Sequence, residues 1–411
     1  MLKEFFKESL DGVMGLSYET IPFWGAMTLG YFLFIIWVYY ARSKFIAGQE
    51  YSLIEIKLPK EILKSPLAME IVLNALYQTS GETTWINRYI EGKVRPWFSL
   101  EMVSIEGSVK FFVWTRKFFK KLVMDQIYSQ YHGVEIHDVD DYTKFVPYGQ
   151  ESDEEWSLWG TEFQFTKADP YPIRTYIEYG LLEDPKEELK VDPMTAVLEY
   201  LGSLSKGEQA WIQILVRASK KNKKPGGLFG FPKNVDWKEE GKELVDKIIE
   251  ESKPKEEGKF GRFLTSAEQD LIKALDHSVS KLGFDCGIRG IYTAKKENFN
   301  AINIMGLIGS FRQYNTNDLN GFRPMNPTSF DYPWEDFRGK RLSKKKARMF
   351  NAYKLRAYFH NAPYPEHLRK PIVLNSEELA TIYHFPGGVA QTPTIEKVES
   401  RKAEPPVNLP I

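Results

Sequence analysis

The 411-residue sequence is poor in the side chains that carry most metal and nucleophile chemistry, with one cysteine, Cys286, and six histidines. A single cysteine forms no intrachain disulfide, which agrees with a reducing compartment. Lys plus Arg and Asp plus Glu both number 55, so the chain has no net charge to attract nucleic acid or an anionic membrane as a whole. These shortages argue against a metalloenzyme or a disulfide scaffold.

The positions of the histidines and of Cys286 in the sequence do not favour metal binding or nucleophilic catalysis. His132 and His137 have Asp138 and other aspartates nearby, but a helix–Gly–strand junction between them makes their side chains diverge, which favours surface or core histidines. Cys286 lies in the middle of an expected strand, where a buried thiol is the simplest interpretation. We expect no catalytic residue, metal or cofactor; a hydrolase using His132, His137 or Asp138 is the remaining enzymatic alternative.

A nucleotide-hydrolase loop is also missing. Residues 226–230 read GGLFG, but Phe231 and Pro232 follow where a Walker loop needs Gly-Lys-Ser/Thr to meet the phosphates and magnesium. No Gly-x-Gly-x-x-Gly motif follows a strand. This composition favours a flexible surface turn.

One long apolar run is present. Residues 21–41, IPFWGAMTLGYFLFIIWVYYA, carry no charge, and a helix of this length spans about 30 Å, the thickness of a bilayer core. Trp24 lies near one end and Trp37 near the other, as amphipathic rings do at headgroup level. The run predicts a single-pass anchor in the bilayer, after an N-terminal flank at 1–20. A cleaved signal peptide and a buried core helix are the alternatives, disfavoured by the length of the run and its basic C-terminal flank.

The positive-inside tendency sets the expected orientation. Arg42 and Lys44 follow the run directly, whereas Lys3 and Lys7 before it lie among acidic residues. We therefore expect an inner-membrane protein with the bulk of the chain in the cytoplasm.

The next stretch predicts a compact α+β domain at residues 51–147. YSLIEIKLP alternates as a strand, Pro66 opens a helix, and two strands meet at Glu106-Gly107-Ser108. A helix from about Phe118 ends at Gly133, and VEIHDVDDYT forms a last strand. The order β-α-β-β-α-β is that of the ferredoxin-like, split βαβ arrangement.

A second α+β domain of related design is expected at residues 158–316. Its predicted strands are TEFQFTKAD, PIRTYIEYG, EQAWIQILVRAS and FDCGIRGIYTAK, and residues 220–230 and 254–261 are expected loops. Helices are expected after Asp192-Pro193, over 237–252, after Thr265 with Glu268 as a capping box, and within NAINIMGLIGSFRQY. The predicted fold class is therefore α+β: one N-terminal transmembrane helix, two ferredoxin-like domains and an extended C-terminal segment.

The aromatic and basic segment at 317–371 contains the strongest local signal. Residues 338–356 hold nine Lys or Arg and no acid, with aromatic residues interleaved. Lys and Arg neutralise phosphates and rings stack on bases, so nucleic acid, lipid headgroups, and a solvated face or protein contact are all open interpretations. The candidate contact residues are Arg338, Lys340, Arg341, Lys344, Lys345, Lys346 and Arg348.

Several phrases together resemble a known kind of bacterial protein: RTYIEYG, DPMTAVLEYLGSL, GEQAWIQILVRA, SFDYPW, VLNSEELATIYHFPG and TPTIEKVESRKAEPPVNLPI. They resemble a membrane-anchored family of unknown function, whose block also precedes the ATPase domain of type IV secretion and conjugation proteins. In such proteins the phrase at Ser376–Pro386 lies just before the motor domain, and the phrase at Pro405–Pro410 lies near the join. The ATPase itself is absent here, so motor activity is not implied.

The resemblance implies a non-enzymatic scaffold or adaptor that accompanies a separately encoded translocating ATPase, and it leaves DNA contact and homo-oligomer formation open. A helix beginning with Ser376 as cap is expected within residues 374–385, inside a C-terminal docking segment at 372–411. The candidate ATPase-docking residues are Glu377, Glu378, Leu379, Tyr383, His384, Phe385 and Pro386. The alternative function is a membrane-tethered nucleic-acid-binding protein that uses the basic run at 338–356.

Overall fold

The structure is a computed structural model, and it describes residues 2–59, 62, 64–146, 148, 155–182, 191–220, 222–224, 233–252, 263–387 and 397–398. The chain divides into two compact units. The first, here the helix unit, comprises Met1–Gln49, Ser80–Val94 and His360–Glu366; the second, the sheet unit, comprises Glu50–Thr79, Arg95–Phe359 and His367–Ile411.

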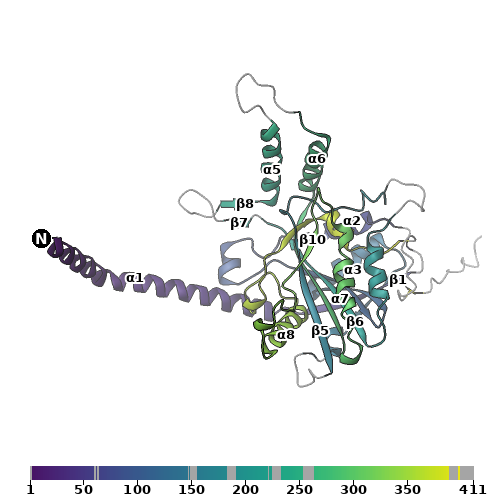
Figure 1. Cartoon of the computed structure of the whole chain (residues 1–411), viewed down its shortest axis with the longest axis horizontal. Helices are drawn as coiled ribbons and strands as arrows, with labels where there is room; N and C mark the ends of the chain where they lie inside the picture. The colour runs from purple at the N-terminus through teal and green to yellow at the C-terminus, as the bar shows by residue number, and fades with distance from the viewer. Residues whose placement is uncertain are drawn as a thin grey trace, which may run out of the picture. The chain divides into compact units, whose positions relative to one another are not determined.

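The helix unit is built around α1, Leu2–Ala47 (Figure 1). Its part from Trp24 to Ala47 is long and apolar enough to cross a membrane, which confirms the predicted apolar helix near the N-terminus. From Trp24 to Tyr40 almost all of its large apolar side chains are exposed. The short π-helix η1, Ile86–Ile90, packs against its C-terminal part.

The first half of the sheet unit follows the predicted β-α-β-β-α-β order. Its strands pair in the antiparallel order β4-β1-β3-β2. Strand β3 therefore lies between β1 and β2, and strand β1 lies between β3 and β4. This pairing fits a split βαβ arrangement. The elements are β1 Tyr51–Pro59, α2 Leu67–Ala75, β2 Phe98–Ile105, β3 Ser108–Arg116, α3 Lys117–Gln130 and β4 Glu135–Val139.

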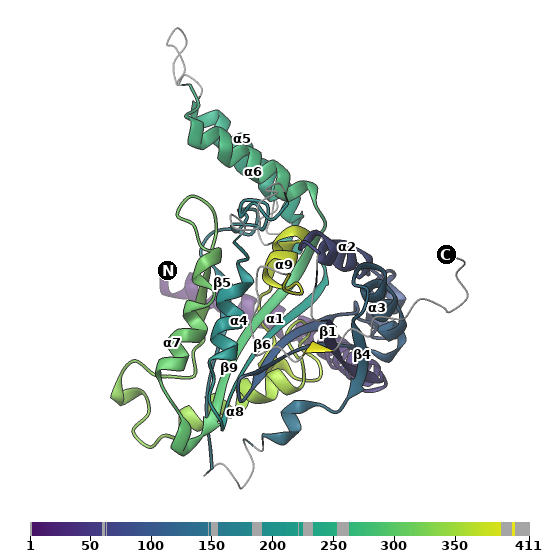
Figure 2. The ribbon, with the colours of Figure 1, turned by 90° about the vertical axis from the view of Figure 1, so that its right-hand side faces the viewer.

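The second half repeats this order with one insertion. Its strands pair in the antiparallel order β10-β5-β9-β6, and the helical hairpin of α5 and α6 is inserted between β6 and β9 (Figure 2). The elements are β5 Trp156–Phe165, α4 Met194–Gly202, β6 Glu208–Ala218, α5 Trp237–Ser252, α6 Ser266–Ser280, β9 Gly283–Lys295, α7 Ile302–Gly309 and β10 Phe322–Met325.

The two predicted domains share one sheet. β2 pairs with β6 in antiparallel register from Phe98 opposite Val216 to Ile105 opposite Gln209. Ten strands of the described residues thus form one large, mainly antiparallel sheet, in which β11 (Ile372–Asn375) pairs with β9 and β12 (Lys397–Val398) runs parallel to β1. The α+β class is confirmed.

The sheet has one apolar face and one mixed face. Alternate strand residues such as Leu100, Ile212 and Ile288 join the main core with side chains of α2, α3, α4, α7 and α9 (Ser376–Ile382). The strand residues that alternate with these point to the other face. Examples are Glu101 and Gln213, which contact α8 (Lys340–Lys354) and the residues after it. The period of two along each strand divides these side chains between the faces.

Several local predictions are confirmed. Glu106 and Gly107 form the hairpin turn with φ of 54° and 85°, and Gly133 takes φ of 84° after α3. Thr265 and Glu268 form the predicted capping box of α6. The glycine-rich loop at 226–230 and the loop at 254–261 lie outside the described residues.

Three local predictions are wrong. PIRTYIEYG is a series of turns and not a strand, because the backbone N–H groups of Ile173 and Tyr176 donate to side chains of α9. The cap of α9 is Asn375 and not Ser376, since the Asn375 side chain accepts from the backbone of Glu378. Within the expected loop at 220–230, Asn222–Lys224 forms the short strand β7, which pairs with β8, Lys233–Val235.

Candidate partner-binding surface

The basic run forms the helix α8, and its charges are concentrated on the outside. Lys340, Lys344 and Arg348 are exposed and stand four residues apart, so they follow one side of the helix. No ion pair joins any of the three to another described residue. We call them the basic stripe. Its like charges repel one another and oppose the helix dipole near the N-terminus, so helix stability does not account for it.

The other predicted contact residues divide into two groups. Arg338 and Arg341 are exposed at the start of α8, and Arg341 donates to the Glu335 carbonyl. Lys345 and Lys346 are half-buried: the Lys345 ammonium donates to the Ser329 carbonyl and lies over the Phe330 ring, and burial lowers the pKa of Lys346. Five of the seven predicted residues are therefore fully available at the surface.

Three exposed rings precede the basic stripe in the sequence. Tyr332 and Trp334 stack on each other with ring centroids 4.7 Å apart, at 54% and 63% exposure, and Phe337 is 85% exposed. Glu335 holds this loop, since its carboxylate accepts from the backbone N–H groups of Asp331 and Tyr332. The rings and the basic stripe together are called the aromatic–basic surface. Trp, Tyr and Arg are the residues most enriched at the energetic centres of protein interfaces.

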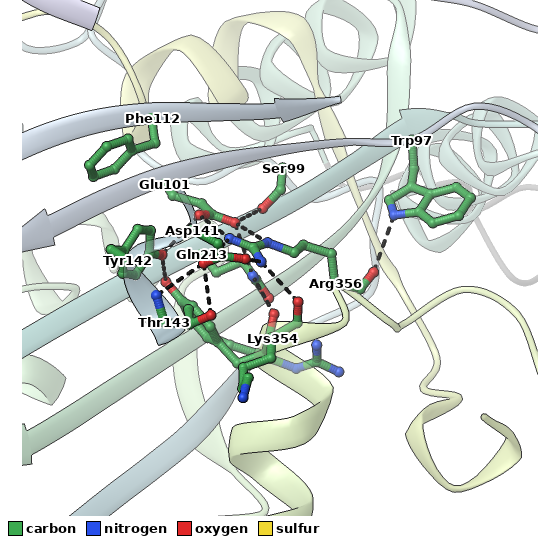
Figure 3. A network of polar contacts seen from close by, with 12 residues as sticks. Trp97, Ser99, Glu101, Phe112, Asp141, Tyr142, Thr143, Gln213, Lys354 and Arg356 are labelled. Carbon is green, nitrogen blue, oxygen red and sulfur yellow. Dashed lines mark hydrogen bonds and ion pairs between the residues drawn. The ribbon is translucent and has the colours of Figure 1, made fainter. Parts of the chain in front are cut away.

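The C-terminal end of α8 is held by a buried ionic cluster on the mixed face of the sheet (Figure 3). Arg356 follows α8 and donates from Nε and Nη2 to the two carboxylate oxygens of Glu101 on β2, at 3.0 and 3.1 Å. Arg356 also pairs with Asp141. Burial opposes ionisation of Asp141, but the guanidinium outweighs it and holds the pKa of that carboxyl below its usual value.

The remaining lone pairs of Glu101 are also used. Ser99 and Gln213 donate to one oxygen, and Tyr142 donates to the other at 2.8 Å. A carboxylate with bonds on both oxygens from four side chains has little capacity left for a substrate. The cluster therefore fixes the segment behind α8 to the sheet and, through it, the place of the aromatic–basic surface.

The predicted ATPase-docking residues belong to the core. Glu377, Glu378, Leu379, Tyr383, His384, Phe385 and Pro386 are all buried. Glu377 pairs with Lys281 at 2.7 Å, and His384 lies 3.3 Å from Asp192. In the described structure none of these side chains forms an exposed surface, because α9 packs inside the main core. The phrase at Pro405–Pro410 lies outside the described residues.

The remaining candidates for chemistry are not brought together. His137 contacts Glu135, and Asp138 pairs instead with Lys120. Cys286 is fully buried, and burial raises the pKa of its thiol well above the usual value. Among the residues that the structure describes, no group of three or more His, Cys, Asp or Glu is placed to hold a metal ion.

Fold and surface together define an α+β protein with a membrane-compatible helix near its N-terminus and one large antiparallel sheet. The chain belongs to the DUF8128 family, a domain of unknown function, whose model matches residues 44–398. No curated protein matches the chain.

Proposed function

We propose that this protein is a non-enzymatic scaffold or adaptor anchored in the cell membrane by residues 21–41. Its sheet unit presents the aromatic–basic surface to a protein partner. The partner is a separately encoded translocating ATPase of the type IV secretion or conjugation kind. The observation that carries the proposal is that rings and cations are exposed together at one site that the buried cluster of Arg356 holds in place. The phrase resemblances described above support the choice of an ATPase.

A protein partner is favoured over nucleic acid by the surroundings of the rings. Tyr332 and Trp334 each have one face occupied by the other ring, so only the outer faces remain for a base. Asp331, Glu335 and Asp336 alternate with the rings along the chain and would repel phosphates. An interface with acidic groups opposite the basic stripe and a pocket for Trp334 satisfies both features.

Charge reversal of the basic stripe tests this proposal. The triple variant Lys340→Glu, Lys344→Glu, Arg348→Glu in the full chain should lose co-purification of a Walker-type ATPase from detergent extract. Its folding should be unimpaired, because all three side chains are exposed and surface substitutions have small effects on stability. Exposed lysines elsewhere provide a matched control, Lys242→Glu, Lys247→Glu, Lys296→Glu, which should retain the partner. Equal recovery with wild type and both variants, or no ATPase with any of them, contradicts the proposal.

A nucleic-acid function is the second candidate, favoured by the stacked rings beside Lys and Arg. It predicts single-strand binding whose affinity falls steeply with salt, with a smaller salt slope in the stripe variant. Filter binding over a salt series distinguishes the two: the scaffold proposal predicts no binding at physiological salt.

A further inference from the structure

The Ser80–Val94 segment of the helix unit exposes large apolar side chains beside an apolar helix. Trp85, Ile86 and Ile90 are 63%, 50% and 46% exposed. Positions 86 and 90 lie about one turn apart in η1, so Ile86 and Ile90 share one side of the element, and Trp85 directly precedes Ile86. Clustered exposed apolar side chains of this kind mark a surface that something covers.

The contacts of Tyr89 place this segment along the apolar run. The Tyr89 ring lies 5.5 Å from that of Phe34, and Trp37 donates from Nε1 to the Tyr89 carbonyl at 3.0 Å. Phe34 and Trp37 precede Ala41, the last residue of the uncharged run, by seven and four positions. At 1.5 Å per residue, Tyr89 therefore contacts the helix about 6 to 10 Å inside the end of the run.

The segment is held closely against the helix. Gly92 takes φ of +66°, and a Cβ there would lie 2.3 Å from the Ala41 backbone, so only glycine allows this approach. Ala41 is buried, and the Tyr39 hydroxyl donates to the Pro363 carbonyl at 2.6 Å. The Gly92 and Tyr89 contacts thus fix the level of η1 along α1.

Several polar groups of the segment bond within it, as a low-dielectric surrounding favours. The Asn87 side chain donates to Thr83 at 2.8 Å, and its backbone N–H donates to the Thr84 hydroxyl. Lys93 pairs with Glu91 at 2.8 Å. Trp85, Ile86 and Ile90 are the exposed large apolar side chains of the segment.

We propose that η1 is a second membrane contact: it lies at the boundary between headgroups and acyl chains of the leaflet in which α1 ends, with Trp85, Ile86 and Ile90 among the acyl chains. Interfacial helices bind lipid in this way, with Trp and aliphatic side chains buried and polar groups outward. The inference rests on the proposed anchoring by α1. The occupant is a phospholipid surface because the contacts of Tyr89 continue directly from the lipid-spanning stretch of the helix.

Single introduced cysteines test the depth of η1. The full chain carries Ile86→Cys or Ile90→Cys labelled with an environment-sensitive fluorophore, in phosphatidylcholine nanodiscs with or without brominated lipid. Leu29→Cys, in the middle of the run, reports the anchor, and Met305→Cys on α7 reports water. Cys286 is buried, and wild type treated with the same reagent gives the blank.

The inference predicts that probes at 86 and 90 emit to the blue of the Met305 probe and are quenched by brominated lipid, though less than the Leu29 probe. If the probes at 86 and 90 emit as in water and are not quenched, while the Leu29 probe is quenched, the inference is wrong and the proposed anchor is supported. A water-like Leu29 probe overturns the anchor and the inference with it.

Discussion

At the scale of single residues, Arg356 is the side chain on which the mixed face of the sheet depends most. It is 1% exposed and joins Glu101 and Asp141, which come from parts of the chain far from it in sequence. Removing one partner of a buried pair leaves the other charge without compensation. Arg356→Met is therefore expected to lower the free energy of unfolding by about 3–5 kcal/mol, measured by denaturant titration.

Two variants control this prediction. The exposed Arg348→Met should change the free energy of unfolding by less than about 0.5 kcal/mol, as surface substitutions do. The double variant Glu101→Met, Arg356→Met should lose less than the sum of the single changes, because neither charge of that pair remains. A mild Arg356→Met effect like that of Arg348→Met is incompatible with the ionic cluster described here.

Glu378 gives the clearest pH dependence. Burial raises its pKa from 4.5 to about 8, although its oxygens accept from the backbone of Asn375 and Ile173. Between about pH 5 and about pH 8 the native state therefore retains a proton that the unfolded state has released, and stability should fall as the pH rises through that window.

The comparison with Glu378→Gln isolates this effect. The amide does not titrate, so the fall in the free energy of unfolding between about pH 5 and about pH 8 should shrink in the variant. A constant loss at all pH values is also expected, because the amide nitrogen faces one of the two N–H donors. Denaturant midpoints across the window measure both effects, and parallel curves for the two proteins exclude a raised pKa at Glu378.

At the scale of elements, the close approach of η1 to α1 depends on Gly92. Gly92→Ala adds a Cβ that clashes with the Ala41 backbone and also pays for a positive φ. The matched control is Gly180→Ala, which has φ of +73° and open space around its Cβ. Amides of residues 86–93 should exchange hydrogen faster only in the Gly92 variant. Protection unchanged from wild type would show that the contact does not need this glycine.

Element prediction from sequence worked where local signals suffice. The capping box of Thr265 and Glu268 and the turn at Gly107 are short-range events, and both formed as expected. Gly133 has the expected positive φ, but α3 already ends at Gln130. PIRTYIEYG was predicted as a strand but forms turns, because its backbone N–H groups donate to Glu378 and Thr381, about two hundred residues later. Alternation alone gives no information about such partners.

Distant partners also explain why the candidate docking residues are buried. Glu377 and Glu378 were candidate docking residues, but inside the core Lys281 pairs with Glu377, and the backbone N–H groups of Ile173 and Asn375 donate to Glu378. The exposed part of the basic run was visible in the sequence from its density of Lys and Arg. The burial of Lys346 and the stacking of Tyr332 on Trp334 were not, since both depend on tertiary contacts.

At the scale of the whole molecule, the sequence indicated two α+β halves but not their union. The strand pairing within each half fits the predicted split βαβ order, whereas the pairing of β2 with β6 joins them. In the structure β2 is buried along nearly its whole length, which an edge strand with a free side would not be. The single sheet provides the rigid base on which the aromatic–basic surface is held.

The account as a whole depends on α1 holding the intact chain in a bilayer. Alkaline extraction of membranes, followed by the mass of the recovered polypeptide, measures this directly. We predict a full-length chain that stays with the lipid, and release when Leu29 and Leu33, in the middle of the apolar run, are both replaced by Arg. A wild-type chain recovered in the soluble fraction, or one cut after the apolar run, contradicts the account.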